Sequence, residues 1–428
     1  MKSLFQRIFN LENHHTSFKQ EILAGVTSFF TIAYITVVNA TILADAGIPL
    51  EAGIIATVLT SFVGCLLIGF YANAPIILVP GMGVNAFFTY TVVESMGLSW
   101  QEGLAAVFVS GVLFIIVAFS GLASILSKSV PRSLKEAITV GIGLFLAFIG
   151  LQKGGIVTSS DTTYVALGDL GSPHVILTIV TLLITLFLFV RNVRGHFLIS
   201  IFAGTVLAGL SGMIDFSKLS SFSFDFKSYG SLFTAMSFDN ILAFPFWIAA
   251  FSLSLIIVFE NMGLLHGLLP DQSKFRRSYQ ANALSTVTAG LFGSSPTVST
   301  VESAAGIQSG GRTGITAIVT GLLFLGSLVF IPVIKIIPDS SIAPILIVIG
   351  GLMVKSIQNI SLQDFSEGFP AFLIIVLIPL TYSIVDGIAF GFITYPLLKI
   401  ALGKGREVPL PLYIIAGLFF MNFFLHEL

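Results

Sequence analysis

Glu260 and Glu302 are the side chains of this sequence with the clearest capacity for chemistry. Each interrupts a stretch of apolar or small residues, at 256–263 and 297–306, whereas nearly all other acidic residues fall in polar stretches. A carboxylate kept in apolar surroundings is paired, protonated or functional, because placing it at the bilayer centre costs about 3 kcal/mol. Glu260 has no basic residue within several helical turns of sequence. Since burial favours the neutral carboxyl group, Glu260 is suited to carry a proton. The alternative is that either carboxyl group only binds a neighbouring backbone group.

Two stretches break the apolar pattern in the same way, and one of them contains Glu302. In 74–85, two prolines and two glycines flank a short β-branched run, and a helix-like run follows from Val84. In 294–306, Pro296 precedes a hydroxyl-rich β-branched run, and Glu302 then begins a small-residue helix, where a carboxylate is favoured. Proline removes a donor and fixes φ, so neither stretch begins as a regular helix. Matching breaks at membrane depth predict a substrate site, with kinks needed only for packing as the alternative.

Other polar residues in apolar segments give weaker indications. Asn85 follows the glycines of the first break and could present its amide to the same cavity, although polar packing in the core fits nearly as well. Asn39, in the first apolar segment, is open to both interpretations. His266 approaches the end of its segment and is expected to be a structural histidine.

The composition places these residues in a membrane protein. Of 428 residues, 55% are hydrophobic and 10% are charged, and the mean hydropathy is +0.99. A soluble domain carries about 25% charged residues, so this chain could not cover a water-facing surface. The net charge of −1 argues against a nucleic-acid partner. A single cysteine, Cys65, leaves no disulfide framework and no thiolate metal cluster. No Walker A sequence is present, which excludes ATP-driven pumping within this chain.

The apolar runs predict a polytopic α-helical protein. A spanning helix needs about 20 predominantly apolar residues, and turn residues and charges divide the chain into fourteen such segments. A last run, 410–424, could cross the bilayer again or lie in its interface. The fourteen segments are 22–43, 53–70, 76–96, 103–126, 134–151, 174–190, 196–213, 241–268, 278–293, 296–309, 314–336, 341–357, 369–384 and 386–402.

The basic residues predict the orientation. Positive charge accumulates on the cytoplasmic side of membrane proteins, and a cytoplasmic N-terminus with fourteen crossings puts sixteen of the 20 basic residues inside. The predicted inside residues are Lys2, Arg7, Lys19, Lys128, Arg132, Lys135, Arg191, Arg194, Lys274, Arg276, Arg277, Arg312, Lys355, Lys399, Lys404 and Arg406, and the outside ones are Lys153, Lys218, Lys227 and Lys335.

The second half of the chain repeats features of the first half. The run Ser110-Gly-Val-Leu-Phe114 corresponds to Thr320-Gly-Leu-Leu-Phe324, and paired glycines follow in each half. These glycines are Gly141 and Gly143 in the first half, and Gly350 and Gly351 in the second. The matches keep their order at offsets of 207–221 residues, although chance similarity of apolar helices is the alternative. A repeat unit of seven spans is odd, so the second copy must be inverted, as in many secondary transporters.

Four sequence motifs resemble one transporter family. They are 72–88 (ANAPIILVPGMGVNAFF), 141–151 (GIGLFLAFIGL), 301–306 (VESAAG) with 310–314 (GGRTG), and 382–391 (YSIVDGIAFG). In this order they resemble the nucleobase:cation symporter-2 family, and specifically its AzgA-like purine permease branch. The resemblance covers residues 16–407.

The resemblance implies a fold of two inverted seven-span repeats, with short antiparallel strands in the broken spans 3 and 10. It implies a core domain at 21–126 and 241–336, and a gate domain at 134–213 and 341–402. A cytoplasmic N-terminal segment, 1–20, and a C-terminal segment, 403–428, complete the chain. Members of the family often form homodimers.

The resemblance also implies site residues. It places proton coupling at Glu260 and Glu302. It also implies a transporter rather than an enzyme, with no metal and no cofactor other than the proton as coupling ion. Span 8 departs from the AzgA-like pattern Phe-Asp-Thr-x-Gly-Thr, because this chain reads Phe259-Glu-Asn-Met-Gly-Leu264. A glutamate there is similar to the uracil and xanthine branches. The implied substrate-binding residues are Glu260, Glu302, Asn85, Gly83, Met82 and Val301.

The resulting hypothesis is proton-coupled import of purine nucleobases of the guanine, hypoxanthine and adenine class across the cell membrane. Alternatives with the same architecture are transport of uracil, xanthine or a small inorganic anion, and the two glutamates count against an anion. A membrane-embedded enzyme or a passive channel would be a different class. An enzyme should show a cluster of ionisable residues at one depth, whereas only two carboxylates are evident.

Overall fold

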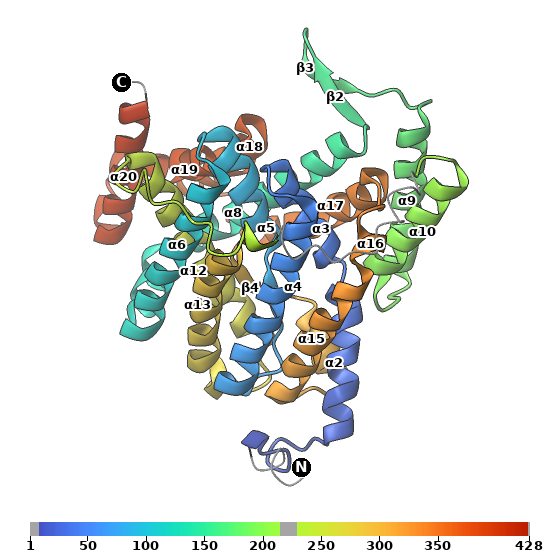
Figure 1. Cartoon of the computed structure of the whole chain (residues 1–428). Coiled ribbons are helices and arrows are strands. Elements are labelled where there is room, and N and C mark those ends of the chain that lie inside the picture. The colour runs from blue at the N-terminus through green and yellow to red at the C-terminus, as the bar shows by residue number, and fades with distance from the viewer. Residues whose placement is uncertain (1–7, 215–228, 427–428) are drawn as a thin grey trace.

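A computed structural model describes residues 8–214 and 229–426, and the statements below concern those residues. The predicted cytoplasmic residues Lys2 and Arg7 and the predicted outside residues Lys218 and Lys227 lie outside the described residues. The described chain is mostly helical, as predicted. Figure 1 shows a helical bundle with α2 beginning near the N-terminus at the bottom, and a β-hairpin projecting at the top.

The first half of the chain alternates long helices with one broken segment. It contains α2 (Phe18–Ile32), α3 (Ile35–Asp45), α4 (Leu50–Leu67) with the π-helical turn Ile68–Ala72, β1 (Leu78–Pro80), α5 (Met82–Ala86) with the π-helical segment Phe87–Ser95, α6 (Trp100–Ser120), α7 (Leu122–Ser129), α8 (Arg132–Lys153), the hairpin strands β2 (Val157–Ser160) and β3 (Tyr164–Leu167), α9 (Pro173–Val190) and α10 (His196–Leu210).

The second half follows the same plan. It contains α12 (Phe244–Leu268), α13 (Phe275–Phe292), β4 (Thr297–Ser299), α14 (Ser303–Gln308), α15 (Gly314–Gly326), α16 (Ile331–Ile334), α17 (Asp339–Val354), α18 (Phe365–Thr381), α19 (Ile384–Ala401) and α20 (Leu410–His426). Each of the fourteen predicted segments overlaps one or more of these elements. Among the described helices, nine are long and apolar enough to cross a membrane.

Two predicted segments contain breaks that the apolar pattern did not reveal. The segment 103–126 is not one helix, because α6 ends at Ser120 and Gly121 adopts a left-handed φ of 79°, which ends a helix. Likewise, 22–43 divides into α2 and α3 at a turn that contains Tyr34. The run 410–424 forms α20, which packs against α19 at the edge of the bundle (Figure 1).

The internal repeat is confirmed by equivalent helix contacts. Gly111 of α6 packs against α13, where an added Cβ would lie 2.7 Å from the backbone nitrogen of Val287. Its counterpart Gly321 of α15 packs against α4, where a Cβ would lie 2.9 Å from Cβ of Cys65. The two halves therefore use equivalent glycines to bring equivalent helix pairs together.

A reciprocal contact between the halves confirms the same relation. A Cβ on Gly143 of α8 would lie 2.8 Å from the carbonyl oxygen of Gly350 in α17, and a Cβ on Gly350 would clash with the carbonyl oxygen of Gly143. Both predicted glycine positions therefore serve the close approach of α8 to α17. Gly351, by contrast, has nothing within 4 Å of an added Cβ.

The two broken segments meet as a short antiparallel sheet, as predicted. Strands β1 and β4 pair with Leu78 opposite Ser299 and Pro80 opposite Thr297, and both strands are buried. Beyond the sheet, the backbone N–H of Ile77 donates to the Ser303 hydroxyl at 3.0 Å. Two non-helical segments thus satisfy each other inside the bundle.

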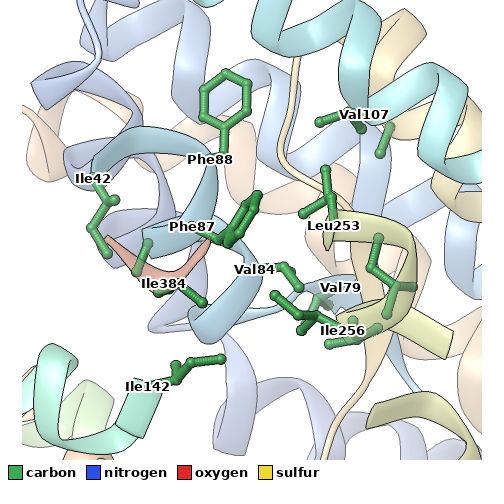
Figure 2. Close-up of a cluster of buried hydrophobic side chains, with 14 of the residues drawn as sticks. Ile42, Val79, Val84, Phe87, Phe88, Val107, Ile142, Leu253, Ile256 and Ile384 are labelled. Atoms are coloured by element: carbon green, nitrogen blue, oxygen red, sulfur yellow. The ribbon is translucent and has the colours of Figure 1, made fainter. Parts of the chain in front are cut away.

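The helices pack in two groups. The first group comprises α2 to α6 and α12 to α16, where α13 packs on α6, α15 on α2 and α4, and α3 on α4. The second group comprises α8 to α10 and α17 to α19, where α8 packs on α17 and α18. Buried side chains around α5, including Val84, Phe87 and Leu253, join the broken segment to its neighbours, and Ile142 of the second group faces them (Figure 2).

Candidate functional site

A cavity of about 690 Å³ lies between the two helical groups, a volume within the usual range for small-molecule sites. The first group contributes the residues around both strands and one face of α12, and the second contributes side chains of α8, α10 and α17. Charged and polar side chains gather at one end, which we call the mouth. The mouth residues are Arg132, Lys135, Glu136, His266 and Ser356.

Glu302 lies in the cavity wall shortly after β4, which ends at Ser299, and it is the N-cap residue of α14. Its Oε1 atom accepts a hydrogen bond from the Tyr34 hydroxyl at 2.7 Å. The position follows from the broken segment, because the pairing of β4 with β1 fixes the chain just before this N-cap residue. The sequence therefore located this carboxylate correctly at the start of a half-helix.

Glu260 lies in the same cavity wall, on α12. Within the described residues its carboxyl group makes no hydrogen bond or ion pair, and the side chain is only partly buried because it faces the cavity. The two carboxyl groups singled out from the sequence are thus brought into one cavity, and within the described residues only Glu302 has a hydrogen-bond partner.

The residue after Glu260 holds the cavity wall in place. Asn261 points away from the cavity, and its Oδ1 atom accepts from the backbone N–H of Ser299 in β4 at 2.8 Å. Its Nδ2 atom donates to the carbonyl of Ile257 at 2.9 Å. These neighbouring residues of α12 therefore have different roles: Glu260 faces the cavity, and Asn261 holds strand β4, which precedes Glu302.

Gly83, Met82 and Val301 line the cavity together with the two glutamates. Val301 is 61% exposed, because it opens onto the cavity between β4 and α14. Gly83 lies where α5 approaches α8, and a Cβ there would lie 3.0 Å from Cγ2 of Ile142. The absence of a side chain at Gly83 therefore sets how closely the two helical groups approach at the cavity.

Asn85 does not line the cavity, so the structure does not bring its amide to the other predicted residues. Its side chain is fully buried, and its Nδ2 atom donates to the carbonyl of Asn39 at 3.4 Å. The rotation of α5 turns this residue toward α3. Asn39 is also buried and binds Thr57 and Ser295, so the core-packing alternative applies to both asparagines.

His266 lies at the mouth with its ring stacked on Phe275 at 4.0 Å and its Nδ1 atom 3.2 Å from the Gln272 amide oxygen. The expected structural role agrees with these contacts. Nearby, the Lys135 ammonium of α8 lies 5.4 Å from the Phe259 ring of α12, so the two helical groups also touch at the mouth.

Polar contacts between the two groups gather at the other end, next to the hairpin, and we call this set the outer latch. Lys153, the last residue of α8, forms an ion pair with Asp45 of α3 at 2.8 Å. Asp45 also accepts a hydrogen bond from the Tyr90 hydroxyl at 2.6 Å. The backbone N–H of Ile384 in α19 donates to the Thr91 hydroxyl at 3.0 Å.

Aromatic rings seal the space beneath the outer latch. The Tyr382 ring meets Phe145 at 5.0 Å and Tyr90 at 6.0 Å, in both cases edge to face. The Tyr382 hydroxyl also donates to the Gln152 side-chain oxygen. Because α8 runs from Arg132 at the mouth to Lys153 at the latch, the mouth and the latch occupy opposite ends of the bundle.

Sequence reasoning missed Tyr34, Phe197 and the latch residues. Tyr34 and Phe197 line the cavity, yet each is an aromatic residue in an apolar segment and has no distinguishing neighbour in sequence. The one available indication was that Asp45 and Lys153 both fall at segment ends predicted to lie on the same side.

Comparisons with known proteins agree with the fold and identify the family of this chain. Residues 19–390 match the pattern of a family described as a permease family. The nucleobase transporter PlAzg2 of Paenibacillus larvae is 48% identical over 89% of this chain and 78% of its own length. The guanine/hypoxanthine permease PbuO of Bacillus subtilis is 41% identical over 98% of this chain and all of its own length. The adenine permease AdeP of Escherichia coli is 35% identical over 98% of this chain and 96% of its own length.

Solved structures share the fold at low sequence identity. The transmembrane domain of the cyanobacterial bicarbonate transporter BicA aligns with a TM-score of 0.66 at 16% identity, covering 86% of this chain and 97% of that domain. The murine Slc26a9 anion transporter in its inward-facing state aligns with a TM-score of 0.62 at 13% identity, covering 90% of this chain and 69% of that transporter. These likenesses establish the architecture alone.

Proposed function

This chain belongs to the nucleobase:cation symporter-2 family of membrane permeases, and on that premise we propose that it carries purine nucleobases across the cell membrane together with protons. The chain is a multi-pass transporter rather than an enzyme. Relatives named for guanine, hypoxanthine and adenine support the purine class.

The observation that carries the proposal is the pairing of Glu260 and Glu302 in one mainly apolar cavity. A purine base is flat and apolar on its faces, and it presents N–H donors and ring acceptors at its edges. Apolar walls suit the faces, and carboxyl oxygens suit the donors, because hydrogen bonds to a charged acceptor are roughly twice as strong as neutral ones. A cavity with two carboxyl groups and no partner for Glu260 within the described residues suits such a ligand.

In the proposed complex the base lies between the two broken segments. Glu302 accepts hydrogen bonds from ring N–H groups, and Glu260 contacts the other polar edge. Met82 and Val301 flank the base, and the Gly83 position leaves room beside α8. Glu260 is the proposed proton carrier, because it faces the cavity without a protein partner in the described chain and lies in apolar surroundings where a neutral carboxyl group is favoured.

Transport in this proposal proceeds by alternating access. The first helical group acts as the core domain and the second as the gate domain, with the cavity between them. In the present conformation the mouth lies at the end that carries the basic residues Arg132 and Lys135, and the outer latch is closed. If the N-terminus is cytoplasmic, this arrangement suits a state that is open to the cytoplasm. A homodimer is part of the proposal, and light scattering of the solubilised protein tests it.

The rival substrates differ in charge. Uracil and xanthine present N–H donors like those of the proposed purines, so they remain alternative substrates. The glutamate in span 8 supports these alternatives, because it is similar to the uracil and xanthine branches. An inorganic anion, such as the substrates named for the two solved structures, is disfavoured because Glu260 and Glu302 would repel it.

Uptake of labelled hypoxanthine or guanine by cells that lack their own purine permeases tests the proposal. We expect uptake that collapses with the proton gradient and is abolished in Glu260→Gln and Glu302→Gln. Glu136→Gln is the matched control, because Glu136 lies at the mouth and pairs with Arg132 at 3.4 Å. Normal gradient-driven uptake in both site variants would refute the mechanism, and competition by unlabelled bases identifies the preferred substrate.

A further inference from the structure

Tyr34 occupies a position that links the broken segment 294–306 to the first span. It lies in the turn between α2 and α3, and its ring is 2% exposed. The hydroxyl reaches Oε1 of Glu302 at 2.7 Å, across 268 residues of sequence. The break in the first span therefore places a hydrogen-bond donor beside the carboxylate that begins α14.

The other side of the Tyr34 ring faces the second helical group. Phe197, in the first turn of α10, meets the ring edge to face at 5.0 Å with an interplanar angle of 67°. Both rings line the cavity. Tyr34 is thus in contact with a substrate-facing carboxylate through its hydroxyl and with the opposite group through its ring.

The hydrogen bond limits what Glu302 can do. A carboxylate can accept several hydrogen bonds, and a phenol that occupies one oxygen fixes the plane of the group. The other oxygen is then held in one direction before a ligand arrives, which lowers the cost of ordering the site on binding. Glu260 lacks such a partner among the described residues, so the two carboxyl groups are not equivalent.

We propose that Tyr34 is a positioning residue of the transport site, whose hydroxyl orients Glu302 toward the substrate and whose ring transmits the position of that carboxylate to α10. The inference rests on the proposed function, since it specifies how the same cavity holds its ligand. When a bound base displaces the Glu302 carboxylate, Tyr34 moves with that carboxylate. The contact between Tyr34 and Phe197 then transmits the movement to the second helical group.

Two single variants separate the two parts of this role. Tyr34→Phe removes the hydroxyl and keeps the ring, so KM for hypoxanthine should rise about tenfold, the scale of one hydrogen bond to a charged group, with Vmax nearly unchanged. Phe197→Leu keeps the hydroxyl contact and removes the ring contact, so Vmax should fall while KM stays the same. Tyr413→Phe is the matched control, because that hydroxyl binds the carbonyl of Gly405 at 3.0 Å, away from the cavity.

A second measurement does not require a transported substrate. Dicyclohexylcarbodiimide modifies protonated carboxyl groups in apolar surroundings, and mass spectrometry of the peptide containing Glu302 gives the rate. Tyr34→Phe should change that rate by up to about tenfold, again the scale of the lost hydrogen bond, whereas Tyr413→Phe should leave it as in the wild type.

Each outcome has one meaning. A Tyr34→Phe protein with the KM and carbodiimide rate of the wild type would overturn the inference. A wild-type protein that takes up no nucleobase would refute the proposed function instead, and the carbodiimide comparison would still decide whether Tyr34 positions Glu302. If Tyr34→Phe and Phe197→Leu change KM and Vmax in the same way, and both variants lose thermal stability, the role is purely structural and the inference is also overturned.

Discussion

Replacing Lys153 by methionine should loosen the outer latch and shift the protein toward the state open at that end. Methionine keeps the apolar stem and removes the ammonium group that lies 2.8 Å from Oδ2 and 2.9 Å from Oδ1 of Asp45. The ion pair joins α8 of the second helical group to α3 of the first. Its loss therefore weakens a contact that exists only while the two groups are closed together at this end.

The magnitude follows from the partial burial of the pair. The side chains of Lys153 and Asp45 are 15% and 28% exposed, between a surface pair worth under about 1 kcal/mol and a buried pair whose disruption costs about 3–5 kcal/mol. We expect about 1–2 kcal/mol, because Asp45 keeps its hydrogen bond from Tyr90 in the variant. That free energy corresponds to roughly a tenfold shift in the conformational equilibrium.

Cysteine accessibility measures this shift directly. Cys65 is buried and is the only cysteine of the chain, so Cys65→Ser gives a background for one reporter, Thr91→Cys, at the latch interface. A membrane-impermeant maleimide should label the reporter about tenfold faster when Lys153→Met is added, if labelling follows the open fraction.

A second ion pair provides the control. Lys335 binds Glu51 at 2.7 Å, but both residues belong to the first helical group, so this pair does not bridge the groups. Lys335→Met should leave the labelling rate unchanged, and the exchange of Asp45→Lys with Lys153→Asp should restore slow labelling in part. Equal labelling in Lys153→Met, Lys335→Met and the parent protein would refute the reasoning.

Three other perturbations have defined outcomes. Gly83→Ala should lower uptake several-fold without unfolding the protein, because its Cβ would lie 3.0 Å from Cγ2 of Ile142. Transport kinetics check this, and Ile142→Ala, which removes Cγ2, should restore uptake in part. Asn261→Ala should lower the thermal midpoint of the purified protein, since the backbone N–H of Ser299 would lose its acceptor at a cost of about 1–3 kcal/mol. Glu21→Ala should destabilise the protein by a similar amount, about 1–3 kcal/mol. The buried Glu21 accepts hydrogen bonds from the N–H of Arg312 at 2.9 Å and the hydroxyl of Thr316 at 2.6 Å, and both would be lost. Denaturation of the solubilised variant measures the loss.

The sequence predicted the features that depend on local composition and on symmetry. The breaks at 74–85 and 294–306 were evident because proline and glycine act through the backbone, and the structure pairs them as β1 and β4. Glu260 and Glu302 stood out because a carboxyl group in an apolar segment needs a reason to be there, and both line the cavity.

Features that depend on contacts between distant segments could not be predicted in the same way. Tyr34 is one of many aromatic residues, and only folding brings its hydroxyl to Glu302. Asn85 was expected in the cavity, but the rotation of α5 that turns it toward Asn39 is set by packing and leaves no trace in the pattern of residues. The end of α6 at Ser120 was missed because the apolar pattern continues through Gly121.

The central claim is that a neutral base and a proton move together through the cavity that contains Glu260 and Glu302. Purified protein in liposomes that enclose a pH-sensitive dye tests it most directly. Addition of hypoxanthine or guanine outside should acidify the interior in the wild type and in Glu136→Gln, and should have no effect in Glu260→Gln. Accumulation of the base with no proton movement, or acidification by sulfate instead of a base, would contradict the account.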